Sequence, residues 1–327
     1  MIEPINEEVG NDHDSQTLAA TAKKPHGKRL KRLVLFLLSI YVGLCLMLMI
    51  IQRKLIYFPT REASLTPASL ELPVDRFHQI TVKSTDGLSL HGWHLLPPGR
   101  SALDEKERQW ELELGRPVIL FFPGNAGNRG YRSAEMEQLS RLNADVFLID
   151  YRGYGDNTGV PSEQNFAKDA RSVWNHLVDN EGISQDRILL LGESLGGGVA
   201  VSLASELFQE GIAPGGLFLK TTFSSLVDVA YSHYPWVPCS LLMTERYPSA
   251  KNIIDITCPI SILHGIHDEI VPFKLAQRLY EAAPEESSSN IPKTFIELPT
   301  ATHNNVLQVA GKEYLDSVDG ILQLIRR

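Results

Sequence analysis

Cysteine is scarce in this sequence, and basic residues do not outnumber acidic ones. The three cysteines (Cys45, Cys239 and Cys258) form neither a CxxC pair nor a Cys/His spacing of the zinc-binding kind. With 31 Lys and Arg against 39 Asp and Glu, the net charge of −8 offers no basic surface for a phosphate backbone. The sequence therefore predicts no metal site, no cofactor and no nucleic-acid partner.

Internal repeats of fixed period are also absent, which excludes solenoid folds. The composition, 43 % hydrophobic and 21 % charged, is that of a globular protein rather than a disordered one. The 327 residues suffice for two average domains or for one large domain with appendages.

The N-terminal part of the chain changes character twice. Residues 1–22 hold five acidic side chains and no Lys or Arg, and six Lys and Arg then follow within 23–32. Residues 33–51 carry no charge, and as a helix they extend about 28 Å, close to the thickness of a bilayer's hydrocarbon core. We predict a disordered cytoplasmic tail with a basic end (1–32), a transmembrane anchor (33–51), a linker (52–75) and a folded domain (76–327).

A cleaved signal peptide and a buried core helix fit this segment less well. No small-x-small cleavage site follows the apolar run, and a buried helix rarely stays apolar on every face. The basic residues before the run, against Arg53 and Lys54 after it, favour a cytoplasmic N-terminus and an extracytoplasmic folded domain. Pairing of Cys239 with Cys258 in such a compartment stays open.

From residue 76 onward, expected strands alternate with expected helices. Two short strands (78–82 and 88–96) flank an Asp86-Gly87 turn and predict an antiparallel edge. Uniformly apolar runs predict strands buried on both faces, at 118–122, 146–149, 188–191, 217–219, 260–263 and 294–298. Helical patterns lie between them, at 132–142, 164–178, 195–208, 273–283 and 304–324. We expect an α/β fold, a mostly parallel eight-stranded sheet with helices on both faces, and a solvated loop or short helix at 100–116.

One serine stands in the context of a nucleophile elbow. Residues 192–196 read Gly-Glu-Ser-Leu-Gly, between the strand 188–191 and the helix 195–208. The glycines on either side of Ser194 remove Cβ atoms that would collide in so tight a turn. Ser194 is therefore the predicted nucleophile.

A serine hydroxyl needs a base, and the base needs an acid to orient it. Asp268 follows the strand 260–263, and His303 follows the strand 294–298, so both are expected at the carboxyl edge of the sheet. We predict that His303 is the general base and then the acid, while Asp268 holds its tautomer and stabilises its cation. For the oxyanion we expect the backbone N–H of Leu195 and that of Asn125, with Ala126 as the alternative.

These residues resemble the α/β-hydrolase superfamily over about residues 80–324, and within it the membrane-anchored, serine-aminopeptidase-like subgroup. The similarity rests on PGNAGN (123–128), DYRGYG (150–155), GESLGG (192–197), HGIHDEIVP (264–272) and THNN (302–305). Pro123 stands where the subgroup usually has a histidine that supports the oxyanion loop. The resemblance implies lysophospholipase or depalmitoylase activity.

The segment between the strands at 217–219 and 260–263 is expected to form a short lid (about 225–250). The apolar side chains of this segment either line a pocket or belong to the core. We predict that Trp236 in the lid contacts substrate, and so does Tyr154, which follows the strand 146–149. We expect a membrane-anchored serine hydrolase that acts on esters or thioesters of acyl chains, in a lipid or an acylated protein. The alternatives are an idle hydrolase-fold scaffold at the membrane and an amide or peptide hydrolase.

Overall fold

The structure is a computed structural model that describes Met1 and residues 26–326. Most of the predicted tail (1–32) therefore lies outside the described residues. The chain divides into two units, Met1–Leu44 and Cys45–Arg327, which are described in turn.

Helix α1 (His26–Ile56) begins in the first unit, and its residues from Cys45 onward belong to the second. Among the described residues, Lys28–Ile56 is long and apolar enough to cross a membrane, by length and composition. The side chains from Leu33 to Val42 are mostly exposed apolar groups, unlike those of a core helix. The helix is thus a possible membrane anchor, and it extends beyond the predicted span (33–51) at both ends.

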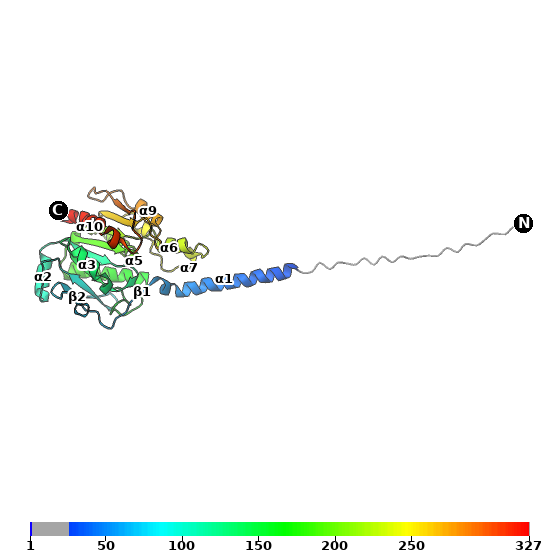
Figure 1. The fold of residues 1–327 in the computed structure, drawn as a ribbon, viewed down its shortest axis with the longest axis horizontal. Helices are drawn as coiled ribbons and strands as arrows, with labels where there is room; N and C mark the ends of the chain where they lie inside the picture. The colour runs from blue at the N-terminus through cyan, green and yellow to red at the C-terminus, as the bar shows by residue number, and fades with distance from the viewer. Residues whose placement is uncertain (2–25, 327) are drawn as a thin grey trace. The chain divides into compact units, whose positions relative to one another are not determined.

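The second unit is built on the predicted eight-stranded sheet, in the order β10-β9-β8-β7-β4-β6-β3-β2 (Figure 1). The strands are β2 (Phe77–Lys83), β3 (Ser89–Leu95), β4 (Val118–Phe122), β6 (Asp145–Ile149), β7 (Ile188–Glu193), β8 (Gly216–Lys220), β9 (Ile260–Gly265) and β10 (Thr294–Leu298). Strand β3 is antiparallel to both β2 and β6, and the remaining pairs are parallel. The mostly parallel sheet with an antiparallel edge is confirmed.

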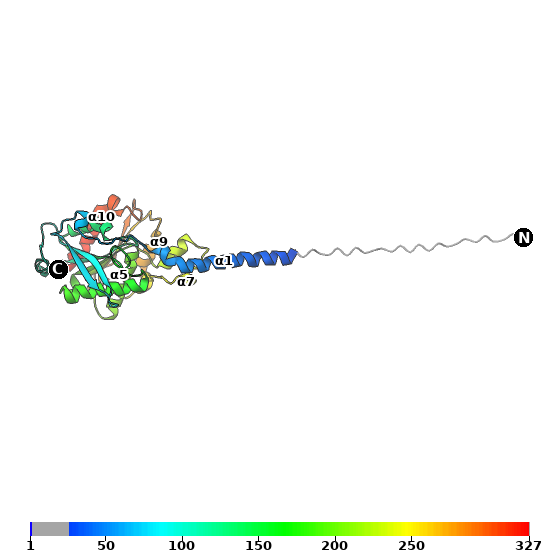
Figure 2. The same ribbon diagram turned by 90° about the horizontal axis from the view of Figure 1, so that it is seen from below.

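Helices cover both faces of this sheet (Figures 1 and 2). The helices α4 (Glu163–Asn175), α5 (Leu195–Gln209) and α9 (Phe273–Ala282) pack on one face, and α3 (Ser133–Ser140) and α10 (Val306–Ile325) on the other. Because successive side chains of a strand point to opposite faces, Leu120 joins the first core and Ile119 the second. Both cores are apolar, as the uniformly apolar strands predict.

Two elements differ from the sequence-based expectation. Strand β10 is only partly buried, because it is an edge strand with β9 as its neighbour: Thr294 and Glu297 are exposed, and Phe295 and Ile296 are half-buried. The segment 100–116 forms helix α2 (Glu105–Glu113), which is not simply solvated: Arg108 is buried and its Nη2 lies 2.8 Å from a Glu181 carboxylate oxygen. One charged side chain of this helix, Arg108, therefore forms a buried ion pair with Glu181.

The predicted linker (52–75) belongs to the second unit and packs against the rest of it. The two-residue strand β1 (Phe58–Pro59) pairs in parallel with β5 (Ala126–Gly127), and Tyr57 and Leu65 are each only 4 % exposed. Short helices α6 (Leu226–His233), α7 (Cys239–Leu242) and α8 (Ser249–Asn252) connect β8 to β9 where the lid is expected. All three cysteines are free.

Candidate active site

Ser194 occupies the turn between β7 and α5 in a strained backbone conformation. Its φ is 52° and its ψ is −116°, a combination that is costly for any residue with a Cβ atom. Two hydrogen bonds hold it there: the Ser194 N–H donates to the Lys220 carbonyl at 2.9 Å, and the Thr222 hydroxyl donates to the Ser194 carbonyl at 2.7 Å. The neighbouring strand β8 and the residues after it therefore fix the turn.

The glycines around Ser194 are required by close backbone contacts. A Cβ atom on Gly196 would lie 2.0 Å from the Phe122 carbonyl oxygen, and one on Gly192 would lie 2.6 Å from the Gly196 carbonyl oxygen. Helix α5 can thus start directly over the end of β4. This contact brings the residues after β4 next to Ser194.

His303 and Asp268 lie beside Ser194, in the loops after β10 and β9. His303 Nε2 is 3.0 Å from Ser194 Oγ, and His303 Nδ1 is 2.7 Å from Asp268 Oδ2. An ionised carboxylate only accepts hydrogen bonds, so Nδ1 carries the proton and Nε2 faces the serine with its lone pair. The structure thus joins the three predicted catalytic residues in one chain of hydrogen bonds.

The Asp268 carboxylate is buried, and polar groups approach both of its oxygens. Its Oδ1 accepts hydrogen bonds from the N–H groups of Ile270 (2.9 Å) and Val271 (2.7 Å), and His264 Nε2 lies 3.2 Å from its Oδ2. Burial alone would raise the pKa of Asp268, but the hydrogen bonds from His264 and His303 outweigh it and lower the pKa to about 2. Asp268 therefore stays ionised and can stabilise a positive charge on His303.

The loop after β4 is held by bonds to Asn125. The Asn125 carbonyl accepts from the Phe58 N–H at 2.9 Å and from the Tyr154 hydroxyl at 2.7 Å, and the Asn125 side chain donates to the Ile56 carbonyl at 2.6 Å. Ala126 lies in β5, paired with Phe58. Tyr154 is buried and holds this loop instead of lining the cavity, which differs from the substrate contact that we predict from sequence.

A partly buried cluster of charges lies at the carboxyl edge of the sheet, next to Ser194. The Glu193 carboxylate is 3.5 Å from Lys220 Nζ and 3.3 Å from Arg132 Nε, and Lys220 also pairs with Glu135. Burial would raise the pKa of Glu193, but the charges of Lys220 and Arg132 outweigh it and lower the pKa to about 2. Sequence reasoning missed this cluster, although a lysine at the end of the apolar strand β8 is a signal that it needs a partner.

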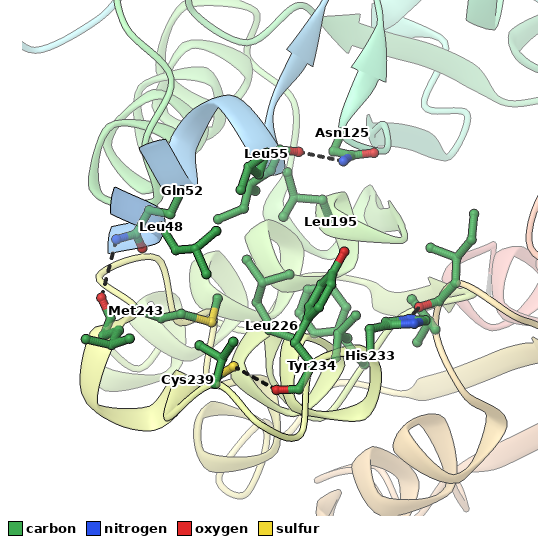
Figure 3. A pocket seen from close by; sticks show the side chains of 18 of the residues that line it. Leu48, Gln52, Leu55, Asn125, Leu195, Leu226, His233, Tyr234, Cys239 and Met243 are labelled. Atoms are coloured by element: carbon green, nitrogen blue, oxygen red, sulfur yellow. Dashed lines mark hydrogen bonds between the residues drawn. The ribbon is translucent and has the colours of Figure 1, made fainter. Parts of the chain in front are cut away.

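Ser194 opens into an apolar cavity of about 620 Å³ (Figure 3). Asn125 and Leu195 line it beside the serine, and Trp236, 52 % exposed, lines it from the lid. The end of α1 lines the cavity from one side and the lid from the other, as Figure 3 shows. Sequence reasoning missed the contribution of α1. No group of three or more His, Cys, Asp or Glu side chains suited to a metal ion occurs within residues 26–326.

Residues 117–213 match the family model for the α/β-hydrolase fold. An uncharacterized protein of Mycobacterium tuberculosis is 37 % identical over 267 residues, covering 82 % of this chain and 85 % of that protein. The lysophosphatidylserine lipase ABHD12 of Danio rerio is 31 % identical over 289 residues, covering 80 % of this chain and 75 % of the lipase.

Among solved structures, an esterase of Pyrococcus furiosus superposes with a TM-score of 0.59 at 18 % identity, covering 82 % of this chain and 97 % of the esterase. At that identity the likeness is one of fold. The relatives, the family model and the sheet topology agree, so this chain belongs to the α/β-hydrolase superfamily and is a hydrolase of the α/β type.

Proposed function

We propose that this chain is a serine hydrolase with Ser194 as nucleophile, His303 as general base and Asp268 as the acid that orients the histidine. The observation that carries the proposal is the continuous hydrogen-bonded chain of 2.7 and 3.0 Å from Asp268 through His303 to Ser194. The three side chains come from three separate loops at one edge of the sheet. The base lies between the nucleophile and the acid, which is the order of contacts that nucleophilic catalysis requires.

The proposed reaction proceeds in two halves. Ser194 Oγ attacks the carbonyl carbon while His303 Nε2 takes its proton, and the resulting negative oxygen is met by the N–H groups of Leu195 and Asn125. Collapse of this intermediate expels the alcohol or thiol, which takes the proton from His303, and leaves an acyl-enzyme. Water then attacks with His303 as base, releases the carboxylic acid and restores Ser194.

The proposed substrate is the ester or thioester of one long acyl chain. The cavity next to Ser194 is lined mainly by apolar side chains, including Phe223, Leu226, Val229 and Val237, and its volume suits one such chain. The relative named a lysophosphatidylserine lipase supports a lipid ester. An ester therefore ranks before an amide or peptide bond.

We further propose that α1 anchors the enzyme in a bilayer, with residues 33–51 as the span. The basic residues in 23–32 support a cytoplasmic N-terminus and an extracytoplasmic hydrolase domain over 76–327. The lid over 225–250 then lies on the same side of the bilayer as the end of α1. Extraction by detergent and resistance to alkaline carbonate are the expected behaviour of the full chain.

A fluorophosphonate probe tests the proposal directly. We expect covalent labelling of the wild type and of Ser202→Ala, a serine within α5, but none of Ser194→Ala. Hydrolysis of p-nitrophenyl esters from two to sixteen carbons, beside matched thioesters and amides, then ranks bond type and chain length. A folded wild type that neither takes up the probe nor hydrolyses any of these compounds would instead support the idle scaffold.

A further inference from the structure

One face of the end of α1 faces the cavity and the lid. Cys45, Leu48, Met49 and Gln52 are spaced by three, one and three residues, so they share one face of the helix. Leu48, Met49 and Gln52 line the cavity that contains Ser194, and so do Leu55 and Ile56 one turn further on. On the same helix Ile50 points away and is 82 % exposed.

Polar contacts fix this face of α1 against the lid. The Gln52 side-chain oxygen accepts a hydrogen bond from the Thr244 N–H at 2.8 Å, and Arg53 Nε lies 2.7 Å from a Glu245 carboxylate oxygen. The Tyr57 hydroxyl donates to the other Glu245 oxygen at 2.6 Å. The distance between α1 and the lid is therefore built into the fold, and the cavity lies between them (Figure 3).

The lid carries large exposed apolar side chains in this cavity (Tyr234 and Trp236) and beside it. Tyr231, Tyr234, Trp236 and Leu241 are 60 %, 56 %, 52 % and 80 % exposed, respectively. Tyr and Trp are enriched where proteins meet the membrane interface, and an exposed apolar patch commonly marks such a contact. These side chains suit a lid whose rim touches lipid.

The apolar wall of the cavity is continuous with the apolar run of the helix. Leu48 and Met49 belong to the uncharged stretch 33–51, while Gln52, Arg53 and Lys54 mark the point where polar side chains begin. With α1 in a bilayer, the cavity between α1 and the lid opens where hydrocarbon meets the interface. An acyl chain can then reach Ser194 without exposing its methylene groups to water.

From these observations we infer that residues 48–56 of α1 form the acyl-chain subsite. A single-chain ester lipid slides its acyl chain from the bilayer between α1 and the lid, and the chain lies against Leu48, Met49 and Leu55 with its carbonyl at Ser194. This inference rests on the proposed function, because it assigns the substrate of that site. It makes the anchor a part of the active site as well as a tether.

The first test fills the subsite from α1. Full-length protein in phosphatidylcholine vesicles is assayed with p-nitrophenyl palmitate and butyrate, as wild type, Met49→Trp, Leu55→Trp and the outward-facing control Ile50→Trp. We expect the palmitate-to-butyrate ratio of kcat/KM to fall at least tenfold in Met49→Trp and Leu55→Trp and to change less than twofold in Ile50→Trp. Equal ratios in all four proteins would overturn the inference, even if Ser194 is the nucleophile.

The second test needs no turnover. Ser194→Ala protein in the same vesicles is irradiated with a lysophospholipid whose acyl chain carries a diazirine, and the attachment sites are mapped by mass spectrometry. We expect attachment inside the cavity, at Leu195 or Leu226, which Met49→Trp reduces and Ile50→Trp does not.

The outcomes of the two tests separate the two proposals. Attachment confined to outward-facing positions such as Leu46 and Ile50 would overturn the subsite. Attachment inside the cavity, with a wild type that hydrolyses no ester and binds no fluorophosphonate, would overturn the proposed hydrolase and keep the acyl-chain subsite.

Discussion

The side chain of Asn125 donates a hydrogen bond to the carbonyl oxygen of Ile56, 2.6 Å away (Figure 3). Ile56 is the last residue of α1, where helix carbonyl groups have no partner within the helix. The Asn125 side chain thus supplies a hydrogen-bond donor to the last carbonyl of the proposed membrane helix. The backbone N–H of the same residue is the proposed oxyanion donor. The position of that donor depends on the position of α1.

Asn125→Ala tests this coupling, because the variant keeps the backbone N–H but loses the bond to Ile56. We expect kcat on a long-chain ester to fall about tenfold, less than the hundredfold or more that accompanies complete loss of an oxyanion donor. KM should change little, since the acyl-binding walls remain. The same kcat in Asn125→Ala and wild type, measured at saturating ester, would show that the bond does not position the donor.

Thr222→Val removes the hydroxyl that donates to the Ser194 carbonyl while it preserves the volume of the side chain. Thr222 is fully buried, and in the variant the Ser194 carbonyl keeps only the hydrogen bond from the Gly197 N–H at 3.0 Å. We expect a loss of about 0.5–1.5 kcal/mol in the free energy of unfolding, measured by urea denaturation, together with a lower kcat. Thr222→Ser, which keeps the hydroxyl, should recover most of both; if it behaves like Thr222→Val, the hydrogen bond is not the cause.

Gly196→Ala places a Cβ atom 2.0 Å from the Phe122 carbonyl oxygen. Both atoms belong to the backbone or are attached directly to it, so the clash cannot be relieved by rotating a side chain. We expect loss of soluble protein or of fluorophosphonate labelling. Gly320→Ala in α10 is the matched control, because a Cβ atom there meets nothing within 4 Å. It should stabilise the protein by about 0.5–1 kcal/mol, measured as a higher Tm. A Gly196→Ala protein as active as the control would contradict the close contact between α5 and β4.

The order of strands and helices could be predicted from the sequence because each element has its own local signal, an apolar run for a strand and a helical periodicity for a helix. Strands β4 and β10 begin and end where the apolar runs do, and Ser194, Asp268 and His303 each follow an expected strand. In a parallel sheet the carboxyl ends meet at one edge, so predicting the strands also predicts that these three residues meet. The partial exposure of β10 was not predictable in this way, since an apolar run does not reveal which strand lies at the edge.

Contacts between residues that are far apart in the sequence could not be predicted from local patterns. Residues 33–51 are apolar at nearly every position, so no periodicity singles out the face of Leu48 and Met49 that lines the cavity. Tyr154 was expected to contact substrate because it follows a strand near the site, yet its hydroxyl turns to the Asn125 carbonyl. The partner of such a hydroxyl depends on three-dimensional packing, which sequence spacing does not specify.

The partly buried Glu193 makes the stability of the protein depend on pH. Its pKa is lowered to about 2 in the fold because the charges of Lys220 and Arg132 outweigh burial, against about 4.3 in an unfolded chain. A lowered pKa adds stability above the unfolded value, which is lost as the pH falls from about 4.3 to about 2; the difference is worth about 3 kcal/mol. Urea denaturation should therefore show wild type more stable than Glu193→Gln at pH 6, with the difference in unfolding free energy closing toward pH 2.

The exposed control Glu113→Gln should match the stability of wild type at every pH. A gap between wild type and Glu193→Gln that stays constant from pH 6 to pH 2 would mean that Glu193 titrates in the fold as it does in the unfolded chain.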